Sequence, residues 1–102
     1  MKIQESRRRA VKRGKHLVVT ASNEAAHQEL SMEEKAELLV RAIELAEESA
    51  LAPGRWRIVL NGPGLATRPT FHIHIICPHP EEKLLRVVTH VPREVIEELE
   101  AK

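Results

Sequence analysis

The chain has 102 residues, and 16 lysines and arginines against 15 aspartates and glutamates leave a net charge of +1. This length suits one domain with a small core, part of which we expect to be buried in a homodimer. No apolar run reaches the ~20 residues of a membrane-spanning helix, and the basic N-terminus lacks the apolar stretch of a secretory signal peptide. We therefore expect a cytoplasmic protein with no membrane partner.

The cations are concentrated at the N-terminus. Residues 1–16 contain seven lysines and arginines and one glutamate, so their local charge is +6 and that of the remainder is −5. A basic arm of this kind can contact nucleic acid, but a solvated, partly helical or frayed terminus is the interpretation we favour. Trp56 and Phe71 are the only aromatic residues, which argues against single-strand binding by base stacking. We divide the chain into a basic arm, 1–13, and one domain, 14–102.

The first predicted elements are a strand and a long helix. The β-branched run over 15–22 is typical of a strand, and 23–30 is expected to form a loop or short turn. Ser31 and Glu34 fit the capping box that begins a helix. Apolar residues then recur at spacings of three and four: Met32, Ala36, Leu39, Ile43, Ala46 and Ala50, widened by Leu38, Ala42 and Leu45. This stripe is expected to cover a sheet, and Ala-Pro-Gly at 52–54 ends the helix.

Three further strands and a short helix are predicted in the second half. The segments 55–61, 70–77 and 83–91 are rich in β-branched and apolar residues, whereas 61–69 contains the glycine, proline and asparagine of a loop. Pro92 is expected to open a short C-terminal helix. Strands joined by short loops usually pair antiparallel. The predicted fold class is therefore α+β, an antiparallel sheet with one long helix packed on a face and a short C-terminal helix.

The strand over 70–77 places two histidines on one face. Side chains alternate along a strand, so one set is expected to face the helix and the other to lie on an open face. The first set is Phe71, Ile73, Ile75 and Cys77, and the second is Thr70, His72, His74 and Ile76. The preceding loop supplies small residues with free amides and a hydroxyl: Asn61, Gly62, Gly64 and Thr67. Such a loop beside two imidazoles can receive an anion such as phosphate.

Several segments resemble the histidine triad (HIT) family of nucleotide-binding proteins. The family signature is His-φ-His-φ-His-φ-φ, with φ apolar, and Thr-Phe-His-Ile-His-Ile-Ile fits it with Thr70 in place of the first histidine. The segments 14–22, 29–48 and 56–64 are similar to the family's Gly-His-x-Leu-Val-Ile-Pro strand, its long helix and its strand ending in Asn-x-Gly. The resemblance covers residues 14–77 in the family's order, and it makes the expected fold HIT-like.

The resemblance implies a reaction and a ligand. In the family, the middle histidine attacks the α-phosphate of a nucleotide conjugate and forms a nucleotidyl-histidine, which water then hydrolyses. His72 is then the expected nucleophile, and His74 is expected to contact the phosphate or the leaving group. The expected ligand-binding residues are Asn61, Gly64, Thr67 and Thr70. The implied activity is that of a nucleotidyl hydrolase or transferase, a phosphoramidase for example, with no metal and no cofactor.

Departures from the family pattern leave other functions open. Thr70 cannot carry the proton or charge of the first histidine. Only 13 residues of this sequence precede Gly14, where the family has a longer front segment, so we expect much of the family's nucleoside pocket to be missing. The main alternative is a degenerate HIT-like domain that binds nucleotide or another phosphorylated ligand without turnover. A metal site made of His72, His74 and either His79 or Cys77 is a further alternative, although four ligands with zinc spacing are not evident. The last alternative is scaffolding or nucleic-acid contact through the basic arm, which we disfavour.

The other histidines are isolated in the sequence. His16, His27 and His90 are expected to be surface or internally satisfied residues rather than ligands. Cys77 is the only cysteine, so no internal disulfide can form, and it is expected to pack as a small apolar group. Trp56 is expected in the core or at a dimer contact.

Overall fold

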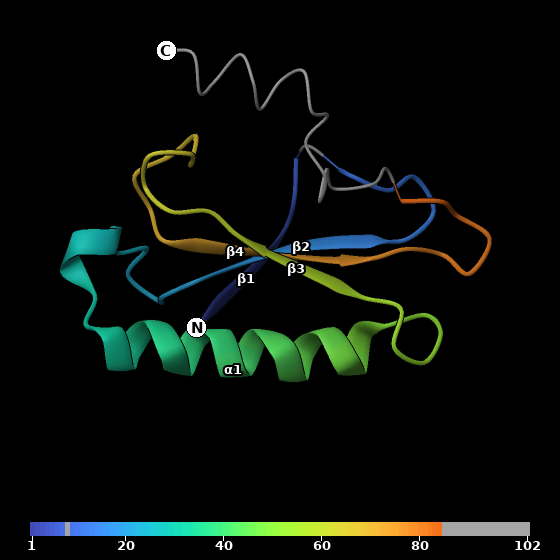
Figure 1. Cartoon of the computed structure of the whole chain (residues 1–102), viewed down its shortest axis with the longest axis horizontal. Helices are drawn as coiled ribbons and strands as arrows, with labels where there is room; N and C mark the ends of the chain where they lie inside the picture. The colour runs from blue at the N-terminus through green and yellow to red at the C-terminus, as the bar shows by residue number, and fades with distance from the viewer. Residues whose placement is uncertain (8, 85–102) are drawn as a thin grey trace, which may run out of the picture.

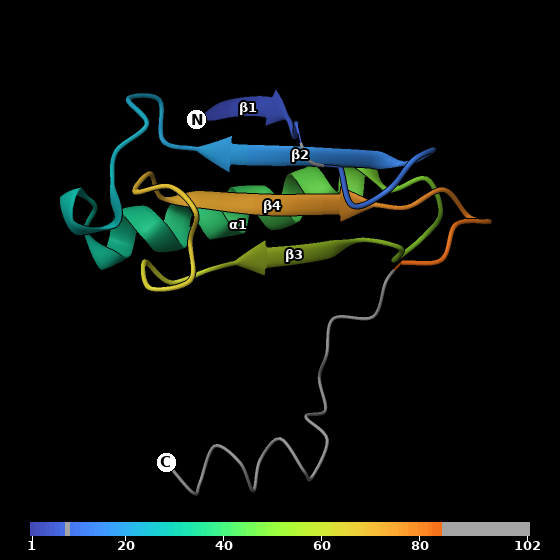
Figure 2. The ribbon, with the colours of Figure 1, turned by 90° about the horizontal axis from the view of Figure 1, so that it is seen from above.

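A computed structural model describes residues 1–7 and 9–84 of the chain. The elements in chain order are β1 (Lys2–Glu5), β2 (Lys15–Thr20), the 3-10 helix η1 (His27–Glu29), α1 (Met32–Ser49), β3 (Arg57–Leu60) and β4 (His72–Cys77). All neighbouring strands pair antiparallel in one sheet, in the order β1-β2-β4-β3, as Figure 2 shows from above. Figure 1 shows α1 lying along one face of this sheet. The predicted α+β class, with one antiparallel sheet and one long helix, is confirmed.

Two predicted elements fall wholly or mostly outside the described part of the chain. They are the strand expected over 83–91, of which only Lys83 and Leu84 are described, and the C-terminal helix after Pro92. Within the described residues, no helix has the length and apolar character needed to cross a membrane.

β1 is an element that the sequence analysis does not predict. Lys2–Glu5 pairs with β2, from Lys2 opposite Thr20 to Glu5 opposite Leu17. The expectation of a helical or frayed terminus is therefore wrong for these four residues. The physical reason is that Lys-Ile-Gln-Glu has one apolar side chain, and an edge strand of this kind is held by its backbone ladder rather than by a side-chain pattern.

α1 begins where the capping box predicts. The Ser31 hydroxyl accepts from the Glu34 N–H at 3.1 Å, and the Glu34 carboxylate accepts from the Ser31 N–H at 3.0 Å. The buried residues of the helix are Leu38, Ala42 and Ala46, with Leu39 and Leu45 packed beside them. The predicted stripe is therefore wrong at its start, because Met32 is 79% exposed and Ala36 is also exposed. The helix has apolar residues on two faces, so periodicity alone does not show which of them meets the sheet.

The core forms between α1 and the predicted face of β4. Phe71, Ile73, Ile75 and Cys77 are all 1% exposed or less, and they cluster with Val19 of β2 and the buried residues of α1. Each large apolar side chain buried in this way contributes about 1.5–3 kcal/mol to stability. Burial on this scale decides which side chains of β4 face the helix. The alternate side chains, His72 and His74, must therefore point away from it.

Gly14 packs closely against the backbone at the end of β4. A Cβ at this position would lie 2.2 Å from the carbonyl oxygen of Cys77 and 2.7 Å from Cα of Pro78. Both are backbone atoms that cannot move aside without breaking the sheet. The glycine therefore permits residues 9–14 to pack against the turn that follows β4.

Candidate functional site

His72 and His74 lie on the same face of β4, as predicted, with ring centroids 5.0 Å apart. The face is less open than expected, because His72 is only 4% exposed and His74 is half-buried. Figure 1 shows the segment between β1 and β2 rising on the side of the sheet opposite α1, which is the side of the histidines. The N-terminal residues thus form a wall of the site rather than a free arm.

A third histidine joins the pair. His16 of β2 is buried, and its Nε2 lies 3.0 Å from Nδ1 of His74. His16 is thus internally satisfied, as one of the two predicted alternatives has it, but its partner is a histidine of the candidate site. In the register of β2 and β4, His16 stands opposite Ile76 and Val18 opposite His74, so His16 and His74 are diagonal neighbours within side-chain reach. Alternation in 15–22 places His16 on one face, but only the strand register shows that it meets His74.

The hydrogen bonds assign the tautomers of two rings. The Ala10 N–H donates to Nδ1 of His16 at 3.0 Å, so this nitrogen has a lone pair and the neutral ring has its proton on Nε2. The His16 Nε2–H then donates to Nδ1 of His74, and neutral His74 must have its proton on Nε2. His74 therefore presents a hydrogen-bond donor on its remaining nitrogen.

His72 has the opposite arrangement. Its Nδ1 lies 2.8 Å from the carbonyl oxygen of Thr70. A carbonyl oxygen only accepts, so Nδ1 of His72 donates and Nε2 of the neutral ring keeps a lone pair. The neighbouring rings thus offer a nucleophilic nitrogen from His72 and an N–H donor from His74.

Burial keeps His16 and His74 uncharged near neutral pH. It lowers the pKa of His74 to about 4, with further lowering from the nearby His72, His16 and Arg68. Burial is also the main cause of the lowered pKa of His16, and the Arg9 guanidinium adds to it. Neutral rings are required for the tautomers assigned above, because an imidazolium donates from both nitrogens.

A hollow of about 790 Å³ opens over His72 and His74. Its other lining residues are Lys2, Gln4, Glu5, Ser6, Arg7, Val18, Glu24, Thr67 and Arg68. Lys2 and Glu24 pair with each other at 3.1 Å. Arg7 and Arg68 make no ion pair with another residue in the described ranges, 1–7 and 9–84. Two guanidinium groups beside two imidazoles suit an anionic ligand with several acceptor oxygens.

The structure brings together only some of the predicted ligand-binding residues. Thr67 lines the hollow, whereas Asn61 and Gly64 are not among its lining residues. Thr70 contributes its backbone carbonyl to His72 and forms an isolated bridge with Ala26. Lys2 and Arg7 line the hollow without any sequence signal for it, because their approach depends on the unpredicted strand β1.

Thr20 is a further residue that sequence reasoning missed. It stands opposite His72 in the β2–β4 register and is 3% exposed. Its hydroxyl is buried and has no hydrogen-bond partner among the described residues. Alternation places it on the face of His16 and Val18, so a polar group without a partner lies next to the candidate nucleophile.

The candidate metal ligands are not assembled. In the described part of the chain, no group of three or more histidine, cysteine, aspartate or glutamate residues is placed to hold a metal ion. Cys77 lies on the core face, where its thiol is 3.9 Å from the Ala46 carbonyl oxygen and burial raises its pKa. His79 lies beyond the end of β4, and its ring contacts Arg13 at 3.2 Å.

Comparison of the chain with models of protein families, with curated proteins and with solved structures finds no match. The chemistry of the site is therefore the basis for any assignment of function.

Proposed function

We propose that the chain is a HIT-like nucleotide-binding protein that hydrolyses or transfers a nucleotidyl group through His72. The observation that carries this proposal is the hydrogen bond between Nδ1 of His72 and the Thr70 carbonyl, because it leaves the Nε2 lone pair of the neutral ring for attack. His72 also lines the hollow in which a ligand would lie.

The proposed reaction has two steps. Nε2 of His72 forms a bond to the α-phosphorus, and the bond from phosphorus to the leaving group breaks with its electron pair on the leaving group. The leaving group takes its proton from solvent. Water then attacks the same phosphorus and gives a proton to solvent, and the P–N bond breaks with its electron pair on Nε2, which restores neutral His72. The His74 N–H stabilises the phosphoryl oxygens by hydrogen bonding. It is not expected to protonate the leaving group, because a neutral imidazole is a very weak acid.

The charges of the hollow support a phosphate ligand. Arg68 lies near enough to His74 to lower its pKa, and it lines the hollow together with Arg7. Guanidinium groups form paired hydrogen bonds with phosphate oxygens. The phosphate would thus lie between the arginines and the two imidazoles.

A second candidate function is binding of a phosphorylated ligand without turnover. Among the described lining residues Val18 is the only apolar one, so the hollow offers a nucleobase little surface on which to pack. Thr70 also contributes its backbone, not a third imidazole, to the site. Both observations favour a ligand recognised mainly through its phosphate.

The proposed partner for the exposed side of α1 is a second copy of this chain. Met32 and Val40, 79% and 55% exposed, lie eight residues apart on one side of the helix, with Ala36 between them. Residues with this spacing form one stripe. Glu37 and Arg41 flank Val40 with opposite charges 4.0 Å apart, so a two-fold contact there can pair each charge with its opposite.

The test is hydrolysis of adenosine phosphoramidate by the purified chain and by His72→Ala. Loss of the nucleophile is expected to lower turnover by roughly 10⁴-fold or more. His79→Gln is the matched control, since this histidine lies outside the hollow, and it should keep wild-type turnover. Equal turnover in His72→Ala would refute the nucleophile. No turnover in any variant, with nucleotide or phosphate binding retained in calorimetry, would establish the second candidate function instead.

A further inference from the structure

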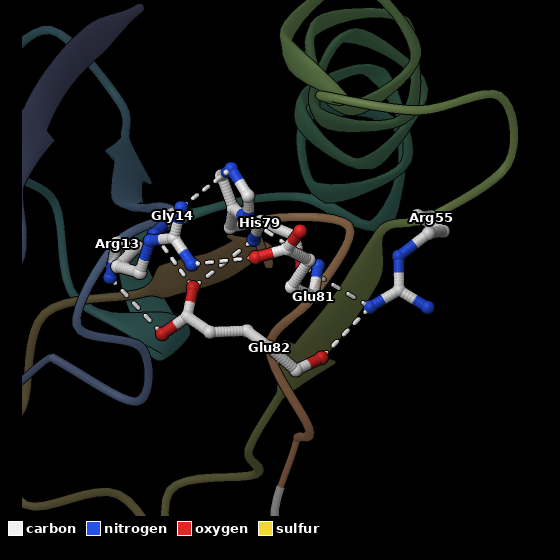
Figure 3. A network of polar contacts seen from close by, with 6 residues as sticks. All are labelled: Arg13, Gly14, Arg55, His79, Glu81 and Glu82. Carbon is white, nitrogen blue, oxygen red and sulfur yellow. Dashed lines mark hydrogen bonds and ion pairs between the residues drawn. The ribbon is translucent and has the colours of Figure 1, made fainter.

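The Glu82 carboxylate is bound by four backbone N–H groups from two separate segments, and Figure 3 shows three of their residues, Gly14, Arg13 and His79, around it. Its Oε2 accepts from Lys12 at 2.6 Å and from Arg13 at 3.0 Å. Its Oε1 accepts from Gly14 at 2.7 Å and from His79 at 3.0 Å. Successive amides that converge in this way form a nest for an anion. These bonds, led by that from Arg13, lower the pKa of Glu82 to about 2.

The backbone on the Glu82 side is itself fixed. The Arg55 guanidinium donates to the carbonyl oxygens of Glu82 at 2.9 Å and of His79 at 3.4 Å, as the dashed lines of Figure 3 mark. Arg13 forms an ion pair with Glu81 at 3.1 Å. The Glu82 carboxylate therefore holds residues 12–14 against the turn that follows β4. Arg55, which precedes β3, holds the backbone of that turn.

The anchored amides lie two residues from a contact with the histidine cluster. Val11, between Ala10 and Lys12, is 4% exposed, so this short connection is packed. The Arg9 guanidinium also donates to the Gly14 carbonyl oxygen, which closes residues 9–14 into a turn. The Ala10 N–H, which gives His16 its hydrogen bond, belongs to this turn.

We infer that Glu82 is a positioning residue, which by anchoring residues 12–14 holds the Ala10 N–H on His16 and so fixes the tautomer of His74. The connection runs from Glu82 through the turn to Ala10, and from His16 to His74. Every link is a contact between described residues, and none depends on the proposed reaction.

The direction of the effect follows from hydrogen-bond chemistry. If the Ala10 N–H no longer donates to His16, Nδ1 of His16 can carry the proton of the neutral ring and Nε2 can keep the lone pair. That lone pair would face Nδ1 of His74, and the two acceptors can bond only if His74 moves its proton to Nδ1. The other nitrogen of His74 then becomes an acceptor. A ligand on that side would meet a lone pair in place of an N–H donor.

The test is NMR of the full chain with ¹⁵N-labelled histidine, which reports directly which ring nitrogen has the proton. The wild-type chain is expected to show His16 and His74 both protonated at Nε2. Glu82→Gln should leave the chain folded but shift His74 partly or wholly to the Nδ1-protonated form, because an amide offers one acceptor where the carboxylate offers two. Glu81→Gln is the matched control, since it removes the exposed ion pair with Arg13 but leaves all four N–H bonds of the Glu82 carboxylate in place, and it should retain the wild-type tautomers.

Ala10→Pro tests the second link without changing Glu82. Proline has no N–H, so the same change at His74 is expected, and this variant decides the question if Glu82→Gln does not fold. Wild-type tautomers at His16 and His74 in folded Glu82→Gln, or in folded Ala10→Pro, would overturn the inference. Because the readout is a ring nitrogen and not turnover, its failure is separate from a failure of the proposed function.

Discussion

At the residue scale, the histidine cluster makes stability depend on pH. An unfolded histidine binds a proton below its ordinary pKa of 6.5, but His74 in the folded chain does so only near pH 4. Between these values the unfolded state binds more protons than the folded state, so the free energy of unfolding falls as the pH is lowered from 6.5 to 4. The lowered pKa of His16 acts in the same direction.

This dependence can be measured by urea unfolding at several pH values. We expect the wild-type chain to lose more stability between pH 6.5 and 4 than His74→Gln does. His79→Gln, whose ring lies outside the cluster, should behave as wild type. An identical pH slope in wild type and His74→Gln would contradict the lowered pKa. Glu82 contributes to the pH dependence of stability in a more acidic range. Its pKa is lowered from 4.5 to about 2, so the stability that its carboxylate contributes is lost only as the pH falls from 4.5 to 2.

The residues of the site differ in how far the sequence could reveal them. His72 and His74 are two positions apart in one strand, so alternation alone predicts that they share a face. His16, Thr20 and Arg7 meet them from other parts of the chain. Their placement depends on strand pairing and on the path of a turn, and neither has a local signature.

At the scale of elements, the start of α1 shows how far a local signal can determine structure. The capping box involves only Ser31 and Glu34, three residues apart, and both hydrogen bonds form as predicted. β1 has no comparable signal, because the strand forms by pairing with β2, which lies further along the chain. The sequence therefore predicts elements with local patterns better than edge strands, which depend on a partner.

Substitution of the helix cap gives a stability prediction for this element. Ser31→Ala removes the acceptor of the Glu34 N–H and should lower the free energy of unfolding by about 1 kcal/mol. Ser31→Asp keeps an acceptor at the same position, next to the positive end of the helix dipole, and should remain close to wild type. Urea unfolding at pH 7 measures both. If the alanine and aspartate variants lose equal stability, the cap does not contribute as described.

At the scale of the whole molecule, the predicted layers are correct because burial decides them. The apolar face of β4 needs a cover, and α1 is the one long helix in the described residues that supplies it. The predicted stripe of α1 is correct at Leu38, Ala42 and Ala46, which are buried, and wrong at Met32 and Ala36, which are exposed, because the helix has apolar residues on two faces. The stripe of Met32, Ala36 and Val40 is thus left exposed in the single chain.

This stripe leads to a prediction about assembly. If a second copy covers Met32 and Val40, the wild-type chain should sediment as a dimer, and its melting temperature should rise with protein concentration because association stabilises the folded state. Val40→Glu places a charge at the centre of the contact and should yield monomers with a melting temperature independent of concentration. Leu65→Glu is the matched control, since Leu65 is 81% exposed but lies in the loop between β3 and β4 and not on α1, and it should remain dimeric. A monomeric wild-type chain at all concentrations would refute the dimer, whereas a dimer that survives Val40→Glu would place the contact elsewhere on the molecule.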